Sequence, residues 1–356
     1  MKLLLVRLSS LGDVLHTLPA LTDMGAAHPD WRLDWLIEPG FGTVAAWHPA
    51  VGRVLPFSLR RFKGKAGGLV PALWALRREL RSADYGAVLD SQGLYKSALL
   101  ARLAGRPVWG LDRQSAREPG AALLYARRFA VPWGRPAIQR NRELFAAALG
   151  YPLPQGPADY GLGQVAEGWR AERLPPPWDA LTQRPFVLGF HATSGAWENK
   201  EWPVSHWQVL AQRLGAAGFR LLLPAMGGRE QARVAAIAKG QENVVPLPSA
   251  NLQELAQLMV RAEAFVGMDT GLSYLAAALG LPGLTLYGPT VAQQGGADSR
   301  WPQLRSAEPC APCGAARCQR RDRAPGSIPC QESLVPDQVW AKLQPLLTLG
   351  DRNAQH

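Results

Sequence analysis

The chain has 356 residues, of which 47% are hydrophobic and 19% are charged. This length and composition fit two globular domains and exclude an intrinsically disordered chain. The formal net charge is +11 and comes mainly from arginine, so we expect either a polyanionic partner (nucleic acid, an anionic membrane surface or a phosphorylated substrate) or simply a generally basic enzyme.

The N-terminal residues MKLLLVRLSSLGDVL do not have the pattern of a signal peptide. Arg7 interrupts the apolar run, and no small-residue cleavage site follows. No stretch of about 18 apolar residues occurs, so we expect no transmembrane helix. These features predict a cytoplasmic protein that can touch a membrane from that side.

Strands and helices alternate along the first half of the chain. Short apolar runs at residues 2–7, 33–37 and 86–90 predict buried parallel strands. Helical spacing predicts helices at residues 14–27 and 96–103. This strand–loop–helix rhythm predicts a parallel α/β sheet.

Prolines are dense between residues 151 and 185, which predicts a linker and the lead-in to a second domain. The rhythm then restarts, with expected strands at residues 186–190, 219–223, 244–247, 264–267 and 283–287, and expected helices at residues 205–217, 229–239, 252–262 and 272–279. Asn251 is the predicted N-cap of the third of these helices. We therefore expect an α/β fold of two doubly wound domains, with ligands in the cleft between them.

Two loops that follow predicted strands carry polar side chains. The first, SSLGD at residues 9–13, opens a helix, where Asp13 is either a helix cap or an acid that faces the cleft. The second, HATSG at residues 191–195, is followed by Lys200. Its hydroxyl groups, amides and ammonium group suit a diphosphate, although a polar surface loop explains the same residues.

Two further segments carry charged residues that could contact a ligand. MDTGLS at residues 268–273 ends a predicted strand and opens a helix, so its amides can bind an anion; Asp269 either accepts a hydrogen bond from a sugar hydroxyl or caps the helix. The run Arg60-Arg61-Phe62-Lys63 lies in the first half of the chain. It is either a binding patch for an anion or a solvated charge run.

All four cysteines lie in one window with the spacing Cys-x2-Cys-x4-Cys-x11-Cys, at Cys310, Cys313, Cys318 and Cys330. This spacing is compatible with a structural zinc site, with reduced thiols or with a disulfide-prone loop. We expect no catalytic use of these residues.

Taken together, these segments resemble the bacterial lipopolysaccharide heptosyltransferases of glycosyltransferase family 9. The resemblance spans residues 1–294 and rests on SSLGDVLHTLPAL at 9–21, LDSQG at 89–93, AREP at 116–119, HAT at 191–193 and DTGLS at 269–273. The LDSQG and AREP blocks are similar to the heptosyltransferase I branch. The resemblance implies a GT-B fold, in which two Rossmann-like domains face each other across a cleft. It places an acceptor domain at residues 1–165, a nucleotide-sugar domain at 166–335 and a C-terminal helix and tail at 336–356.

The resemblance also implies an activity. Members of this family transfer L-glycero-D-manno-heptose from ADP-heptose to a Kdo residue of the lipid A inner core, with inversion and without a cofactor. Asp13 matches the general base. Four basic residues match the acceptor site, namely Arg60, Arg61, Lys63 and Arg117.

Seven residues match the donor site by the same resemblance. Thr193, Ser194 and Lys200 match residues that hold the diphosphate, Glu230 matches the ligand of the ribose, and Asp269, Thr270 and Gly271 match the loop at heptose and phosphate. The sequence departs from the family at Tyr274, where a histidine is common. The implied partners are ADP-heptose, Kdo-lipid A and an anionic membrane surface on the inner face of the inner membrane, and not nucleic acid.

Two alternatives remain open at the level of the sequence. The first is a heptosyltransferase II-like enzyme that adds heptose to an already heptosylated core. The second is a non-catalytic polyanion-binding protein, for which a basic surface is sufficient. That second reading gives no reason for Asp13, Thr193, Lys200 and Asp269 to stand at four loop positions.

Overall fold

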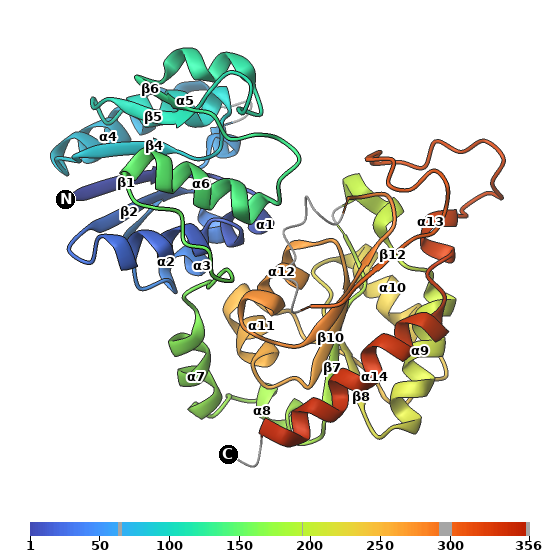
Figure 1. The fold of residues 1–356 in the computed structure, drawn as a ribbon. Coiled ribbons are helices and arrows are strands. Elements are labelled where there is room, and N and C mark those ends of the chain that lie inside the picture. The colour runs from blue at the N-terminus through green and yellow to red at the C-terminus, as the bar shows by residue number, and fades with distance from the viewer. Residues whose placement is uncertain (63–65, 194, 292–300, 354–356) are drawn as a thin grey trace. The chain divides into compact units, whose positions relative to one another are not determined.

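The computed structural model describes residues 1–62, 66–193, 195–291 and 301–353 (Figure 1). The chain forms two compact units, which comprise Met1–Leu162 (unit 1) and Gly163–His356 (unit 2). Lys63 and Ser194, two of the predicted site residues, lie outside the described residues. Each unit is a parallel sheet covered by helices, so the predicted α/β class is confirmed.

Unit 1 contains a six-stranded parallel sheet in the order β3-β2-β1-β4-β5-β6. Its strands are β1 (Lys2–Val6), β2 (Arg32–Ile37), β3 (Val51–Pro56), β4 (Ala87–Asp90), β5 (Val108–Leu111) and β6 (Arg127–Phe129). Its helices are α1 (Leu11–Leu15), α2 (Leu18–Ala27), α3 (Gly42–Ala46), α4 (Ala66–Ser82), α5 (Tyr95–Arg102) and α6 (Ala137–Leu149), with short 3₁₀ turns η1 (Pro39–Phe41), η2 (Leu59–Phe62) and η3 (Pro119–Leu124).

The sheet of unit 1 changes direction of winding between β1 and β4. These two strands are neighbours and pair in parallel from Leu3 with Ala87 to Val6 with Asp90. In a doubly wound sheet such a switch point leaves a crevice at the carboxyl ends of the two strands. The loops after β1 and β4, which begin at Arg7 and Ser91, therefore meet at this edge.

Unit 2 repeats the architecture, with the strand order β12-β11-β10-β7-β8-β9. Its strands are β7 (Phe186–Phe190), β8 (Arg220–Leu223), β9 (Val244–Pro246), β10 (Ala264–Met268), β11 (Gly283–Tyr287) and β12 (Gln303–Arg305). Its helices are α7 (Gly163–Ala171), α8 (Trp178–Leu181), α9 (Val204–Ala216), α10 (Gly228–Ala238), α11 (Leu252–Met259), α12 (Gly271–Ala278), α13 (Pro329–Glu332) and α14 (Pro336–Asn353), with the 3₁₀ turn η4 (Gly195–Lys200).

A separate apolar core stabilises unit 2. Trp202 and Trp207 are fully buried, and Val339 and Leu343 of α14 pack into the same cluster. Figure 1 shows α14, in red, lying beside α9. The tail helix therefore completes the core of unit 2.

Several sequence-based expectations are corrected by the structure. The single helix expected at residues 14–27 is two helices, α1 and α2, because the chain turns at His16 and Thr17 and Pro19 stands in the first turn of α2. The strands β3, β5, β6 and β12 were not expected. The predicted N-cap at Asn251 is confirmed, because its side chain accepts hydrogen bonds from the amides of Gln253 (2.9 Å) and Glu254 (3.0 Å).

No helix in the described part of the chain is both long and apolar enough to cross a membrane.

Candidate active site

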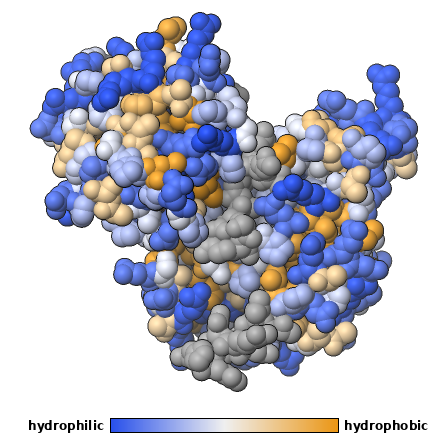
Figure 2. Space-filling view, in the orientation of Figure 1, coloured by the Kyte–Doolittle hydropathy of each residue, from blue (hydrophilic) through white to orange (hydrophobic). Residues whose placement is uncertain are grey.

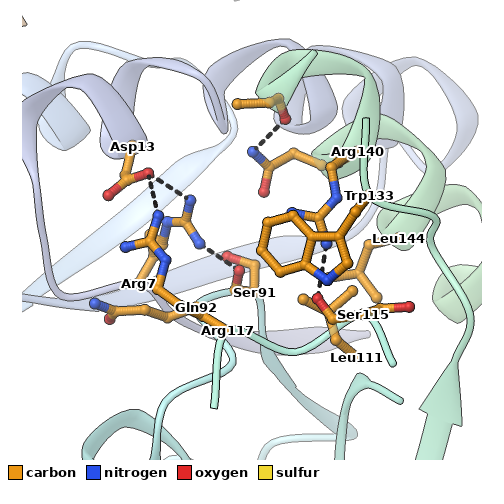
Figure 3. Close-up of a pocket in the computed structure, with 12 residues that line it drawn as sticks. Arg7, Asp13, Ser91, Gln92, Leu111, Ser115, Arg117, Trp133, Arg140 and Leu144 are labelled. Carbon is orange, nitrogen blue, oxygen red and sulfur yellow. Dashed lines mark hydrogen bonds and ion pairs between the residues drawn. The ribbon is translucent and has the colours of Figure 1, made fainter. Parts of the chain in front are cut away.

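Asp13 stands in the first turn of α1, directly after the loop that follows β1. One of its carboxylate oxygens, Oδ2, accepts hydrogen bonds from the backbone amide (3.0 Å) and hydroxyl (3.2 Å) of Ser10. The other, Oδ1, lies 3.2 Å from Nη2 of Arg7 and 3.7 Å from Nη2 of Arg117 (Figure 3). Asp13 therefore closes a capping box with Ser10, as one interpretation of the sequence expected, and its second oxygen faces two guanidinium groups of unit 1.

The electrostatic surroundings keep Asp13 ionised. Burial by itself raises the pKa of this carboxyl, but the charges of Arg7 and Arg117 outweigh burial, and the pKa lies below its ordinary value. Arg7 is itself buried and donates a second hydrogen bond to the carbonyl oxygen of Ser91. The Asp13 carboxylate is therefore held by the guanidinium group of Arg7, which is itself held by its hydrogen bond to Ser91.

The DSQG segment at residues 90–93 organises the loop that carries Asp13. The buried carboxylate of Asp90 accepts hydrogen bonds from the hydroxyls of Tyr125 (2.7 Å) and Ser97 (2.8 Å) and from the amide of Gln92 (2.8 Å). The Gln92 side chain accepts from the amide of Leu8 (2.8 Å) and donates to the carbonyl of Ser9 (3.2 Å). This network joins the loop after β4 to the loop after β1.

Gly93 brings the same segment against Arg117. Its φ angle is +68°, and a Cβ atom at this position would lie 3.2 Å from the backbone nitrogen of Arg117. Only glycine adopts this conformation freely and leaves that space empty. The LDSQG and AREP blocks, which are distant in the sequence, therefore meet at the same edge of the sheet.

A small cavity of about 60 Å³ opens beside Asp13 (Figure 3). Three guanidinium groups line it, from Arg7, Arg117 and Arg140, against one carboxylate. The buried hydroxyl of Ser91 also lines the cavity and has no hydrogen-bond partner among the residues that the structure describes. A cavity with an excess of positive charge and an unpaired hydroxyl suits an anionic, hydroxylated ligand.

Trp133 forms one wall of this cavity. The guanidinium group of Arg140 lies 3.7 Å from the centroid of the Trp133 ring and donates a hydrogen bond to the carbonyl of Ser115 (2.7 Å). Trp133 is 53% exposed, so the ring combines a free apolar surface with a cationic neighbour. Neither residue was predicted from the sequence, because α6 and the loop before it carry no motif.

The described part of the predicted basic run, Arg60 to Phe62, lies in η2. Arg60 and Arg61 are exposed, and Nε of Arg60 lies 3.8 Å from the carboxylate of Glu38. Neither lines the cavity beside Asp13, whereas the predicted Arg117 does.

The predicted donor residues that the structure describes lie in unit 2, in the loops that follow its strands or in the helical turns directly after those loops. Nζ of Lys200 lies 2.7 Å from Oδ2 of Asp269, and both side chains are largely buried. Burial raises the pKa of Asp269, but the ion pair with Lys200 outweighs burial, and the pKa is below its ordinary value. The hydroxyl of Tyr274 also donates to Asp269. The loops after β7 and β10 are therefore held together by a charge pair.

The loop at residues 268–273 places its helix start next to this pair. Thr270, and not Asp269, is the N-cap residue of α12, so the reading of Asp269 as a helix cap is wrong. The hydroxyl oxygen Oγ1 of Thr270 is buried, and no described part of the chain supplies it with a hydrogen-bond partner. Gly271 is the first residue of the helix, where backbone amides point outward and attract anions.

Thr193 lies at the end of a second charged network. Its amide donates to Oε1 of Glu201 (2.9 Å) and its hydroxyl to the carbonyl of Trp197 (2.8 Å). Glu201 pairs with Arg229 at 2.7 Å, and Arg229 donates to the Thr193 carbonyl (2.8 Å). Sequence reasoning missed Glu201 and Arg229; the position of Glu201 beside Lys200 was the available signal.

Glu230 lies in the first turn of α10. Its Oε2 accepts a hydrogen bond from the amide of Met226 (2.7 Å), which fixes the carboxylate at the loop after β8. Met226 is 64% exposed. The predicted ribose ligand therefore stands at the edge of unit 2 where its parallel strands end.

The four cysteines line a single cavity of about 220 Å³, together with Asn199 and Arg320. Burial and the neighbouring thiols raise the pKa of Cys330 to about 12. Within residues 1–62, 66–193, 195–291 and 301–353, no three cysteine, histidine, aspartate or glutamate side chains already form a metal-binding group. The four thiols therefore line one cavity but do not have the geometry of a formed metal site.

Comparison with known proteins places this geometry in a family. The family model described as glycosyltransferase family 9 (heptosyltransferase) matches residues 73–322. The chain belongs to this family. The relatives that match it include lipopolysaccharide heptosyltransferase 1 of Pseudomonas aeruginosa, which is 44% identical over 322 residues, 89% of this chain and 87% of that protein.

A second relative and a solved structure agree with this family assignment. Lipopolysaccharide heptosyltransferase 1 of Escherichia coli K12 is 41% identical over 299 residues, 82% of this chain and 88% of that protein. The solved structure described as E. coli heptosyltransferase WaaC with ADP matches with a TM-score of 0.83 and 35% identity, and the match covers 97% of this chain and 100% of that one. The protein is a glycosyltransferase, and the predicted GT-B fold class is confirmed.

Proposed function

We propose that the protein transfers L-glycero-D-manno-heptose from ADP-heptose to a Kdo residue of the lipid A inner core, with inversion at the anomeric carbon. The observation that carries this proposal is Asp13, held ionised between Arg7 and Arg117 at the wall of a cationic cavity. The two relatives reported above, which are 44% and 41% identical, are both named lipopolysaccharide heptosyltransferase 1, and these names support the first heptose position.

In the proposed reaction Asp13 is the general base. The acceptor hydroxyl oxygen attacks the anomeric carbon, its proton passes to Asp13, and the bond from that carbon to the phosphate oxygen breaks, so that ADP leaves with the electron pair. Arg7 and Arg117 lower the pKa of Asp13. The carboxylate is therefore a weak base, but it is deprotonated at neutral pH and able to accept a proton. Such a base is suited to a transfer in which the hydroxyl becomes acidic only as the new bond forms.

The acceptor is proposed to bind in unit 1. Kdo is an acidic sugar, and the guanidinium groups of Arg117 and Arg140 at the cavity supply planar donors for its carboxylate. The unpaired hydroxyl of Ser91 can accept or donate a hydrogen bond to a sugar hydroxyl. Arg60, Arg61 and Lys63 are proposed to contact other anionic groups of the acceptor.

The donor is proposed to bind in unit 2. Lys200 is the cation for the diphosphate, with Thr193 and Ser194 as hydroxyl and amide contacts and Glu230 at the ribose. Lys200 is paired with Asp269 in the structure, so a diphosphate competes with that carboxylate for the ammonium group. Thr270 and Gly271 present a helix N-terminus, which stabilises the charge on the leaving phosphate.

We propose further that the reaction uses the residues above and no metal. The protein works in the cytoplasm at the inner face of the inner membrane, where its lipid-borne acceptor is embedded.

The decisive experiment measures ADP release from ADP-L-glycero-D-manno-heptose with a Kdo-bearing lipid A acceptor, for the wild type and for Asp13→Asn. We expect turnover by the wild type and a loss of at least about 100-fold in kcat for the variant, with donor binding retained. Turnover only with an already heptosylated core would establish the heptosyltransferase II-like alternative. Absence of both turnover and ADP binding would overturn the enzymatic proposal and favour a polyanion-binding protein.

We also propose, separately from the reaction, a structural zinc ion at Cys310, Cys313, Cys318 and Cys330. Their shared cavity supports it, as does the segment of residues 306–328, which is described without helix or strand and which a metal would hold in place. Elemental analysis of protein purified without added metal should find one zinc per chain, lost in Cys310→Ser. Metal-free protein with freely reactive thiols would contradict the proposal.

A further inference from the structure

The exposed apolar side chains of the described residues are unevenly distributed. Polar and charged residues cover much of each unit on the face that Figure 2 shows, with apolar residues scattered among them. Nine large apolar side chains are exposed among the described residues. Five of them belong to three neighbouring elements of unit 1, α4, α5 and η3: Val70 (59%), Trp74 (63%), Tyr95 (50%), Leu99 (56%) and Leu123 (75%).

These five residues lie on one side of unit 1. The inner faces of α4, α5 and η3 pack into the same core cluster, through residues such as Leu80, Ala98 and Ala121. All three elements therefore cover the same face of the sheet, and their outer faces point to the same side. Val70 and Trp74 are four residues apart on α4, as are Tyr95 and Leu99 on α5, so each pair forms a stripe along its helix.

One of the two apolar stripes begins near the edge of the sheet that carries Asp13. Tyr95 is the first residue of α5, which follows the loop after β4. The amide of Tyr95 donates to the carboxylate of Glu118, the residue that follows Arg117. The Tyr95 end of the apolar surface is therefore joined to the segment that carries Arg117 of the acceptor cavity.

Arginine surrounds this surface. Exposed guanidinium groups stand on the same elements and on η2, from Arg60, Arg61, Arg78, Arg81 and Arg102. Arg77 lies over the Trp74 ring, 5.3 Å from its centroid. Glu79 is the only acidic residue in the sequence of η2, α4, α5 and η3, and it pairs with Arg53 at 3.4 Å. The surface combines apolar area with a strong excess of positive charge.

We infer that the outer face of α4, α5 and η3 is the surface by which the protein docks on an anionic lipid bilayer. Tryptophan and tyrosine favour the headgroup region, and exposed leucine and valine enter the acyl boundary. Each arginine close to an anionic leaflet adds to the attraction. This inference rests on the proposed function for one point, that the acceptor is embedded in the membrane; docking by this face presents the cavity at Asp13 to it.

The test measures binding of the full chain to vesicles by sedimentation. The vesicles contain either phosphatidylglycerol mixed with phosphatidylethanolamine or phosphatidylcholine alone. We expect wild-type protein to bind the anionic vesicles preferentially and to be released by salt. The double variant Trp74→Ser/Leu99→Ser should bind about tenfold more weakly or worse, because the buried apolar area is lost. Arg78→Glu should weaken binding by at least about fivefold.

A matched control comes from unit 2. Val335 is exposed there as well, at 39%, and Val335→Ser should bind vesicles as the wild type does. All variants should keep the wild-type melting temperature, since the altered side chains are exposed. Turnover of a delipidated, water-soluble Kdo acceptor should be unchanged in Trp74→Ser/Leu99→Ser, whereas turnover of the lipid-borne acceptor in vesicles should fall.

Two results would overturn the inference. One is wild-type protein that binds anionic and zwitterionic vesicles equally or not at all. The other is a folded Trp74→Ser/Leu99→Ser variant that binds anionic vesicles like the wild type, which would assign the face to a protein partner or to no partner. Vesicle binding without heptose transfer would instead leave the docking surface standing and overturn the proposed function.

Discussion

Asp13 serves the structure and the proposed chemistry with different oxygen atoms. Oδ2 accepts from Ser10 and closes the start of α1, while Oδ1 faces Arg7 and Arg117. A helix cap and a general base are compatible roles for Asp13, because they use different oxygen atoms of the carboxylate. The capping contacts fix the carboxylate in one orientation, which is what a general base requires.

The pH dependence of the reaction should report the arginines around Asp13. Its pKa is lowered by Arg7 and Arg117 against the opposing effect of burial. In Arg117→Met one of these charges is gone, so the pKa rises and the acidic limb of the kcat/KM profile should move to higher pH. The exposed Arg113, four residues earlier, supplies the control: Arg113→Met should leave the limb in place. A limb that does not move in Arg117→Met would show that Asp13 is not the group that titrates.

A second residue-scale prediction concerns the buried pair of Lys200 and Asp269. Their side chains are 14% and 11% exposed, so Lys200→Met leaves an unpaired carboxylate and should lower the free energy of unfolding by about 3–5 kcal/mol. Lys200→Met/Asp269→Asn should restore much of that stability, because no charge remains unpaired. Chemical denaturation measures both.

The same pair of variants separates stability from donor binding. If Lys200 holds the diphosphate, both variants should bind ADP more weakly than the wild type by at least about tenfold, measured by calorimetry. Recovery of ADP affinity in the double variant would mean that Lys200 acts only by neutralising Asp269.

The sequence contains the signal for the site residues that follow strands and no signal for those that reach the site through tertiary contacts. Asp13, Lys200 and Asp269 stand in polar loops after apolar runs, so they could be singled out. Arg140 lies on α6 and reaches the cavity of Asp13 by packing of that helix on the sheet. Contacts at such sequence separation depend on the sheet order, which apolar patterning does not give.

At the scale of elements, apolar runs made most of the strands predictable. The buried strands β1, β7 and β10 appear in the sequence as apolar runs. Length did not decide the outcome, because the three-residue β9 was expected and the six-residue β3 was not. The missed strand β6 consists of Arg127, Arg128 and Phe129. Such segments become strands because a neighbouring strand offers hydrogen bonds, and this is tertiary information.

Helix termination in unit 1 allows a prediction at the same scale. Gly150 follows α6 with a φ angle of +77°, the left-handed conformation of a helix end. Gly150→Ala should therefore lower the free energy of unfolding by about 1 kcal/mol, measured by urea denaturation.

Gly168 provides the opposite case. It lies inside α7, is exposed, and nothing stands within 4 Å of a Cβ placed there. Gly168→Ala should raise the free energy of unfolding by up to about 1 kcal/mol. Equal effects of the two substitutions would mean that the conformation of Gly150 is not the cause.

At the scale of the whole molecule, the chain is built from two units with separate cores. The cluster around Leu80 and Val88 stabilises unit 1, and the cluster around Trp202 and Trp207 stabilises unit 2. The residues proposed for the acceptor all belong to unit 1, and those proposed for the donor all belong to unit 2. A ligand of one site should therefore stabilise mainly the unit that carries it.

Hydrogen exchange with and without ADP tests whether the donor binds to unit 2 alone. A ligand at a concentration of 100 times its Kd stabilises the binding state by about 2.7 kcal/mol. ADP should slow exchange at η4 (Gly195–Lys200), at the start of α10 near Glu230 and at Gly271, within unit 2. Exchange in α2 and in β2 of unit 1 should not change. In Lys200→Met the same ADP concentration should give weaker protection at these segments, because the cation for the diphosphate is gone. Protection confined to the loop of Asp13 and the cavity of Arg117 would instead assign nucleotide binding to unit 1 and reverse the proposed roles of the two units.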